Sequence, residues 1–408
     1  MRKKIKVLII ALVAILGGGA LSFFIAGFAT SGTISNSFTF NYRNIPLSVE
    51  DLNLNVDLGS LDIKYNTSNT PYIVKIDVDL TISGLFMTDR QYTDFFKSAT
   101  EWWQNTTSPL IFDMELLPAV WFNPAFWFKS YNIKVSVVLR TDVVFDISAI
   151  AGTGSIEMTI PDDISLKNIT ISSGTGSAFL NASNNVEIDG TVDINAGTGS
   201  IGLISSGANI TGGLVADTGT GSISINLANS NLEEDISLRA GTGSVTFLVR
   251  KAACSGGLTA SSGTGSVTVN FTNSVMGQSI NLDTGTGSIN FKTYDMIYLD
   301  DSVWMMSTGT GGIDIEITQH MGMNANITGT LTTGTGKISI LYKDGSADVG
   351  ASFFGSTGTG NFIRVNSGGF ASITNNPWDS LDFTSANNKY DISASTGTGN
   401  IEVDGLSV

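Results

Sequence analysis

The sequence is poor in the residue types on which catalytic and metal sites are most often built. Its 408 residues include one histidine, His320, and one cysteine, Cys254. A single cysteine excludes an intramolecular disulfide framework and a zinc site made of several cysteines. A Ser-His-Asp triad would depend on His320, and no nucleophile-elbow motif accompanies it. We therefore predict no catalytic residue, no metal site and no cofactor.

Charged residues are also scarce, at 14% of the chain, and the basic ones are fewest, with 21 Lys and Arg against 36 Asp and Glu. The formal net charge is −15. All the acidic residues lie beyond position 30, whereas Arg2, Lys3, Lys4 and Lys6 precede it. Because a surface of this sign repels phosphate backbones, nucleic acid is excluded as a partner.

Only one long apolar run is present, at residues 7–29, after the basic start MRKKIK. About 20 apolar residues cross a bilayer, and the basic flank stays inside, so we predict a signal anchor at 1–30. A cleaved signal peptide competes, because Gly18 and Ala20 suit a cleavage site. Both interpretations export the remainder. With no N-terminal cysteine or hydrophobic C-terminal tail for lipid attachment, we expect a single-pass protein of the cell membrane, with its N-terminus inside and its C-terminal ectodomain outside.

Glycine, in contrast, is abundant and strictly placed. Eleven Gly-Thr-Gly triplets begin at positions 152, 174, 197, 219, 241, 263, 285, 309, 334, 358 and 397, and most are 22 to 25 residues apart. A constant period of this size indicates a stacked repeat. We predict that residues 151–408 form an all-β parallel solenoid, with loops of about eight residues after each second strand and a longer loop in the 39-residue interval before the last triplet.

The triplet itself predicts a corner. In EDISLRAGTGSVTFLV, Ile236, Leu238 and Ala240 share one parity, and Val245 and Phe247 share the other. A straight strand cannot change parity, so two short strands must meet at the triplet, whose middle threonine then points outward. Glycine permits positive φ and close approach of neighbouring rungs. The predicted structural corner glycines are Gly152, Gly154, Gly174, Gly176, Gly197, Gly199, Gly219, Gly221, Gly241, Gly243, Gly263, Gly265, Gly285 and Gly287.

Residues 33–150 form a separate opening region. LNLNVDLGSLDIKY, around Gly59, has the repeat pattern with a shortened triplet and predicts an opening rung. Thr88 and Gln91 resemble a capping box before an apolar face, which predicts a short amphipathic helix over 88–104. An aromatic segment follows, so 88–131 is an insertion that either caps the solenoid or contacts a membrane or protein partner. The contact candidates are Trp102, Trp103, Trp121, Phe122, Phe126 and Trp127.

Two further surface features follow from an exported chain. Six triplets are preceded by threonine, and Thr-x-Thr ladders resemble ice-binding surfaces, but the parity change separates the two threonines. N-glycosylation sequons are more numerous. They occur at Asn66, Asn105, Asn168, Asn181, Asn209, Asn270 and Asn326.

An N-terminal anchor followed by serial TGTGSI and TGTGNI units resembles the putative-adhesin domain family of prokaryotic envelope proteins. The likeness covers residues 50–84 and 132–408 and implies a surface-exposed β-solenoid with an adhesive role. We therefore predict a cell-surface, membrane-anchored, non-catalytic protein with surface glycans or envelope proteins as partners. One alternative is an envelope accessory that holds a membrane or protein partner through its aromatic insertion. The second is a polysaccharide-acting enzyme, since solenoid enzymes use wall carboxylates, of which Asp193, Asp217, Asp314 and Glu316 are examples.

Overall fold

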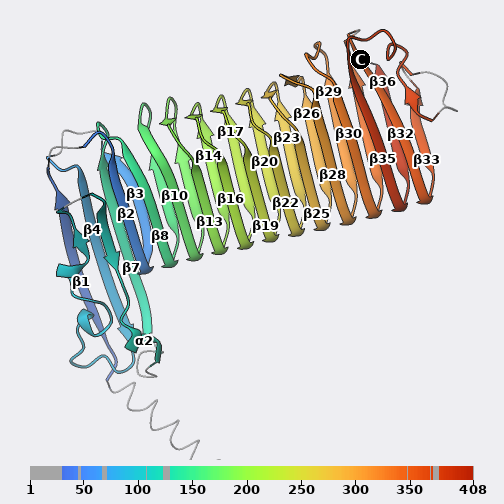
Figure 1. Ribbon diagram of the computed structural model, residues 1–408. Coiled ribbons are helices and arrows are strands. Elements are labelled where there is room, and N and C mark those ends of the chain that lie inside the picture. The colour runs from blue at the N-terminus through green and yellow to red at the C-terminus, as the bar shows by residue number, and fades with distance from the viewer. Residues whose placement is uncertain are drawn as a thin grey trace, which may run out of the picture.

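The computed structural model describes residues 30–44, 47–66, 71–106, 108–122, 129–346, 348–367, 369–370 and 376–407. Their strands form an elongated, all-β solenoid in which two long sheets face each other (Figure 1). Each turn of the chain, here called a rung, contributes one strand to each sheet. The predicted all-β class with parallel strands is confirmed by the pairing of successive rungs.

The first sheet, sheet A, has 15 strands. In spatial order they are β1 (Gly32–Tyr42), β4 (Val74–Gly84), β7 (Lys129–Arg140), β3 (Ser60–Asn66), β9 (Ile156–Ile160), β11 (Ala178–Ala182), β14 (Ile201–Ser206), β17 (Ile223–Ala228), β20 (Val245–Arg250), β23 (Val267–Thr272), β26 (Ile289–Tyr294), β29 (Ile313–Gln319), β31 (Ile338–Asp344), β36 (Ile401–Ser407) and β33 (Phe362–Ser367).

The opposing sheet, sheet B, runs alongside it. Its strands in spatial order are β5 (Trp103–Gln104), β6 (Leu110–Met114), β2 (Glu50–Leu58), β8 (Phe145–Thr153), β10 (Ser165–Thr175), β13 (Val192–Thr198), β16 (Leu214–Thr220), β19 (Ile236–Thr242), β22 (Leu258–Thr264), β25 (Ile280–Thr286), β28 (Ser302–Thr310), β30 (Ile327–Thr335), β35 (Asn388–Thr398), β32 (Val349–Thr359) and β34 (Trp378–Asp379).

A third, narrow ladder lies where the sequence predicts only loops. Two-residue strands follow the sheet A strands of six central rungs and pair in parallel with their counterparts one rung away. They are β12 (Glu187–Ile188), β15 (Asn209–Ile210), β18 (Asn231–Leu232), β21 (Ala253–Cys254), β24 (Val275–Met276) and β27 (Ile297–Tyr298). The loop prediction is therefore wrong here, because each return segment buries one apolar side chain and holds it by backbone pairing.

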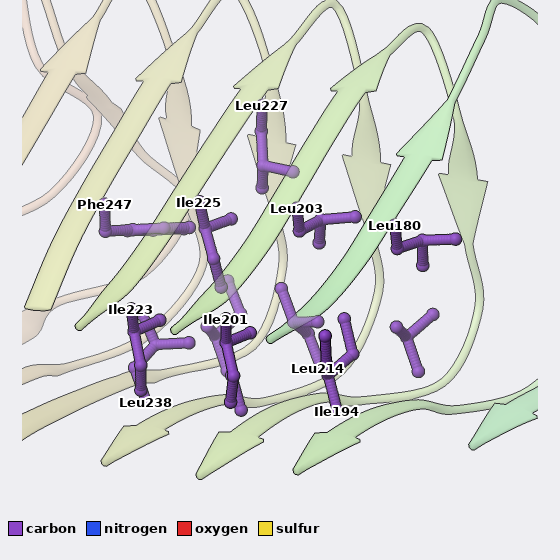
Figure 2. Packing of buried hydrophobic residues seen from close by; sticks show 14 of the residues in the cluster. Leu180, Ile194, Ile201, Leu203, Leu214, Ile223, Ile225, Leu227, Leu238 and Phe247 are labelled. Atoms are coloured by element: carbon purple, nitrogen blue, oxygen red, sulfur yellow. The ribbon is translucent and has the colours of Figure 1, made fainter. Parts of the chain in front are cut away.

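The space between the sheets is filled by one apolar core. Along β19 the buried residues are Ile236, Leu238 and Ala240, and along β20 they are Val245, Phe247 and Val249. Figure 2 shows side chains from the two sheets pointing toward each other, among them Leu238 of β19 and Ile223 of β17. The parity of the buried positions changes across the triplet, as predicted. Each rung therefore buries both of its strands on the same central core.

Glycine at the corner is required by the neighbouring rung. Gly243 has φ +133°, and a Cβ atom there would lie 1.9 Å from the carbonyl oxygen of Gly221. The backbone nitrogens remain bonded between rungs, since Gly243 N donates to Thr264 O at 2.8 Å. A residue with a side chain would break this contact, because it disfavours positive φ and has no room.

The small residue before each triplet has a second structural role. Thr218, Ser262 and Thr284 are buried, and their hydroxyls donate to the carbonyl of the second triplet glycine one rung earlier. For Thr284 Oγ1 and Gly265 O the distance is 2.8 Å. Such a hydroxyl satisfies a carbonyl that lies at the bend, where pairing is interrupted. Copies with alanine at this position fill the same narrow space without that bond.

The N-terminal end is closed by strands outside the repeat. On sheet A, β4 pairs antiparallel with both β1 and β7, and β7 pairs with β3. On sheet B, β6 covers β2, and β5 covers β6. The opening rung, β2 and β3, thus lies inside these end strands and pairs with β8 and β9. Its Gly59 has φ +130°, like the second glycine of a full triplet.

The helix predicted over 88–104 is wrong. This stretch contains only two 3-10 turns, η1 (Tyr92–Asp94) and η2 (Ala99–Glu101), followed by β5. The capping-box contacts form instead around Gln91 and Asp94. Phe95, Phe96 and Trp102 are all buried at the end of the core. Aromatic residues have modest helix propensity, and packing of their rings against the open end of the sheets outweighs it. The described part of the insertion has one short helix, α2 (Pro118–Phe122).

The rungs at the C-terminal end do not stack in sequence order. β30 and β31 are followed in space by β35 and β36, and β32 and β33 lie outside them. Figure 1 shows β35 between β30 and β32. The constant period predicts that rungs stack in the order of the sequence, and this prediction is wrong for the last two repeats. The 39-residue interval between the last two triplets gives the chain enough length to return from the outermost rung to the position of β35, between β30 and β32.

Candidate ligand-binding groove on sheet A

The corner glycines are structural rather than part of a ligand loop. A Cβ atom at any of the fourteen predicted positions would lie 1.9 to 2.7 Å from a backbone carbonyl of the neighbouring rung. No space for a phosphate or other ligand remains between these rungs. The glycines hold the walls in position, and the walls carry the exposed side chains.

Threonine lines the corner in a single row. The middle threonines of successive triplets, such as Thr220, Thr242 and Thr264, are exposed and aligned in register. Five of the six threonines two residues earlier, Thr218 among them, are buried. Thr-x-Thr therefore forms no pair of exposed rows, as the parity change predicts, and gives no flat two-row strip of the ice-binding kind.

The four wall carboxylates are divided between the two sheets. Asp193 of β13 accepts a hydrogen bond from Asn195, and Asp217 lies on β16, both on sheet B. Asp314 and Glu316 lie on β29 of sheet A. Glu316 accepts from Lys343 Nζ at 2.8 Å and from Lys292 Nζ at 3.0 Å. Hydrogen bonds from these two ammonium groups hold the pKa of the Glu316 carboxyl below its ordinary value.

The single histidine follows β29 beside the same wall. His320 Nδ1 lies 3.2 Å from Asp295 Oδ1, and the His320 backbone nitrogen donates to the same oxygen at 2.7 Å. Its ring lies 5.3 Å from that of Tyr294, centroid to centroid. In the described residues no group of three His, Cys, Asp or Glu side chains is placed to hold a metal ion.

Two adjoining hollows mark the outer face of sheet A. The first has a volume of about 290 Å³, the second about 230 Å³, and they share Asn270 and Thr272. We call the two together the sheet A groove. Its lining residues are Asn226, Leu248, Val249, Arg250, Asn270, Thr272, Lys292, Thr293, Tyr294, Glu316 and Thr318.

The groove follows the solenoid axis because its residues are register partners. Asn226, Leu248, Asn270, Lys292 and Glu316 form one row across five neighbouring strands. A second row is made of Arg250, Thr272, Tyr294 and Thr318. With about 4.8 Å between neighbouring strands, the longer row spans roughly 19 Å.

The groove is positively charged in an acidic protein. Its lining contains Arg250, Lys292 and Glu316 as charged groups, so the two cations exceed the one carboxylate. Glu316 is already paired with Lys292 and with Lys343 beside it. Arg250 is exposed and forms no ion pair with the part of the chain that the structure describes. Tyr294 adds an aromatic ring that is 43% exposed.

The charged residues at the groove are not close together in the sequence. Lys292, Glu316 and Lys343 belong to three successive repeats and are 24 and 27 residues apart along the chain. Alignment of the repeats in phase would have placed Lys292 and Glu316 in one column. The grouping of Arg250, Asn270 and Tyr294 would also have emerged from such an alignment, whereas its hollow shape depends on side-chain size.

The sequons lie at very different sites. Asn168 and Asn209 use their side-chain amides between rungs, with Asn168 Nδ2 donating to Asp146 at 2.7 Å and Asn209 Nδ2 to Glu187 at 2.9 Å. Asn326 is exposed and Asn181 is half-buried. Asn270 lines the groove. Asn66 and Asn105 are described, but part of each sequon lies outside the described residues. Use of all seven stays a prediction.

The aromatic contact candidates divide into three groups. Trp102 is fully buried, with its ring 5.2 Å from Phe38 and its indole nitrogen donating to Lys97 O, so its prediction as a contact residue is wrong. It closes the end of the core instead. Trp103 is half-buried against the same core. Trp121 and Phe122 belong to α2, and Phe126 and Trp127 lie outside the described residues.

Comparison with known proteins finds few that are similar to this chain. No family model matches it, and no curated protein matches it. A solved structure of a putative cell adhesion protein from Clostridium sporogenes aligns over 91% of this chain and 100% of its own, with 10% identity and a TM-score of 0.21. Similarity this low carries no argument about function, and the resemblance to the putative-adhesin domain family stays a prediction.

Proposed function

We propose that this protein is a cell-surface, membrane-tethered β-solenoid with a structural or adhesive role. The observation that carries this proposal is the continuous core. Buried side chains extend from Leu52 in the opening rung to Val403 in the last one without a break into separate domains. A solenoid with such a core is a stiff rod, because each rung is held by its neighbours on both sides. Its function then lies in what its walls present.

The wall chemistry supports binding rather than catalysis. A general acid at neutral pH needs a carboxyl whose pKa is raised, whereas the pKa of Glu316, the one carboxylate that lines the groove, is lowered by its two lysine partners. Of the other wall carboxylates named above, Asp314 shares β29 with Glu316, whereas Asp193 and Asp217 lie on two strands of the opposite sheet. The alternative of an envelope accessory that holds a partner through its aromatic insertion cannot use Trp102, because that side chain is buried inside the cap. We therefore propose a non-catalytic surface protein.

The predicted location rests on the apolar run at 7–29, which lies outside the described residues. Within the part that the structure describes, no helix has the length and apolar character needed to cross a bilayer. Cysteine labelling of the full chain on intact cells tests the location. The natural Cys254 is buried, and burial raises the pKa of its thiol to about 12, so it stays unreactive toward a maleimide. A Thr220→Cys variant adds one exposed thiol at a corner.

We expect a membrane-impermeant maleimide to label the Thr220→Cys chain on intact cells and to leave the unmodified chain unlabelled. Labelling that appears only after permeabilisation would refute the surface location. The adhesive role is tested with the same cells, by comparing adhesion to immobilised envelope polysaccharide with and without residues 151–408. Equal adhesion of both would refute that role.

A further inference from the structure

We propose that the sheet A groove binds an acidic polysaccharide, a glycan chain whose sugars carry carboxylates. This inference rests on the proposed surface role and assigns it a ligand class and a site. In the proposed complex, Arg250 pairs with a sugar carboxylate, the Asn226 and Asn270 amides bind hydroxyls, and a sugar ring stacks on Tyr294.

The shape of the groove favours a linear polymer. Its two rows of side chains run across the strands, parallel to the solenoid axis, over five neighbouring strands from β17 to β29. A compact ligand would fill one hollow, whereas an extended chain can occupy both, which meet at Asn270 and Thr272. The repeat therefore supplies a binding row whose length grows with the number of rungs it crosses.

The chemistry favours a carbohydrate over a peptide. Every strand beneath the groove is paired on both sides, so no backbone edge is available for an added peptide strand. An amphipathic helix would need several apolar anchors, but Leu248 and Tyr294 are the main exposed ones among the lining residues. Amides, hydroxyls and one exposed aromatic ring instead match a ligand with many hydroxyls and one apolar face.

The charge favours carboxylates on that glycan. A guanidinium binds a carboxylate through two parallel hydrogen bonds, and Arg250 has no competing acidic partner in the described residues. Glu316 offsets only part of the charge of Lys292 and Lys343, because it is shared between them. The positive excess in the groove lining contrasts with the net charge of −15 for the chain. A carboxylated sugar is therefore complementary to the groove itself.

The test measures binding of fluorescent oligogalacturonate to the full chain in detergent micelles. Arg250→Gln should weaken binding about tenfold or more, as loss of a charge-assisted hydrogen bond does. Tyr294→Ala should also weaken it. The matched control is Arg239→Gln, which removes the same charge from an exposed position on sheet B. We expect this control to change affinity less than about twofold, since its charge is not in the groove. Unchanged thermal transitions show that the variants fold.

Four results would overturn the proposal. Equal losses in the two arginine variants would mean that only overall charge matters. Equal binding of a neutral cello-oligosaccharide of the same length would show that the groove does not recognise carboxylates. Equal binding of polyglutamate that is unaffected by Tyr294→Ala would show that the groove does not recognise sugar rings. Finally, binding seen only in Asn270→Gln, together with a glycan on Asn270 in the natural chain, would show that the protein's own glycan fills the groove.

The outcome is separable from that of the proposed function. If surface labelling of the Thr220→Cys chain succeeds and oligogalacturonate does not bind, the protein is a surface solenoid without this ligand. If labelling fails while the isolated chain binds the oligosaccharide, the groove is assigned and the location is refuted.

Discussion

Replacement of Gly243 by alanine tests the central structural argument, that the triplet is a corner closed by its neighbour. Gly243 has φ +133°, and an added Cβ would lie 1.9 Å from Gly221 O. An ordinary C···O contact is roughly 3.3 Å, so the two rungs would have to separate by more than an ångström. Rotation of the backbone to a conformation that alanine accepts would strain the corner and its two bonds, Gly221 N to Thr242 O and Gly243 N to Thr264 O, each 2.8 Å.

Together these effects should lower the free energy of unfolding by about 3 to 5 kcal/mol, from strain of about 1 to 3 kcal/mol and about 1 kcal/mol for each bond. Chemical denaturation followed by circular dichroism measures the change. Gly257→Ala is the control, because Gly257 is not among the glycines with positive φ and its nearest neighbour atom would be 3.3 Å from the added Cβ. Equal, small losses in both variants would refute the assignment of the triplet as a tightly packed corner.

The remaining predictions concern the corner hydroxyls, the cap and the far end. Thr284→Val should lower the free energy of unfolding by about 1 to 2 kcal/mol, because it removes the hydroxyl that donates to Gly265 O. The control is Thr286→Val, at an exposed position of the same rung, which should change the free energy of unfolding by less than about 0.5 kcal/mol. Similar losses in both variants would contradict the assigned hydrogen bond. Trp102→Ala should lower the unfolding free energy by about 3 to 5 kcal/mol, and an unshifted thermal transition would show that Trp102 does not close the core. Burial raises the pKa of Asp344 to about 6, above its ordinary value, so its contribution to stability is present below about pH 4 and is lost as pH rises through 6. Asp344→Asn should flatten this part of the stability profile measured by denaturation at each pH, and an unchanged slope would assign it to another group.

The solenoid itself was largely accessible from the sequence. Side-chain parity around Ala240 and Val245 located the corner, and the constant spacing of the triplets implied parallel stacking. Both inferences depend on local sterics, since alternation fixes which face is buried and glycine fixes where the chain can bend. The exposed middle threonines followed from the same reasoning and are confirmed.

The two ends of the solenoid were harder to predict from the sequence. The helix predicted over 88–104 was inferred from a local pattern, whereas Phe95, Phe96 and Trp102 are placed by the open end of the core that they cover. The order of the last rungs was also outside the reach of periodicity. Each rung presents nearly the same pairing edge, so β36 can pair with β31 as well as β33 can, and connection length and packing choose between them.

The groove shows the same division. The sequence by itself determined that every rung bends at its glycine triplet and alternates buried and exposed side chains, because these properties arise within a few consecutive residues. Only the tertiary structure decided that Lys292 meets Glu316, that Arg250 lies beside Asn270, and that these side chains frame one groove. Such contacts join different rungs, so they depend on how the rungs stack in register.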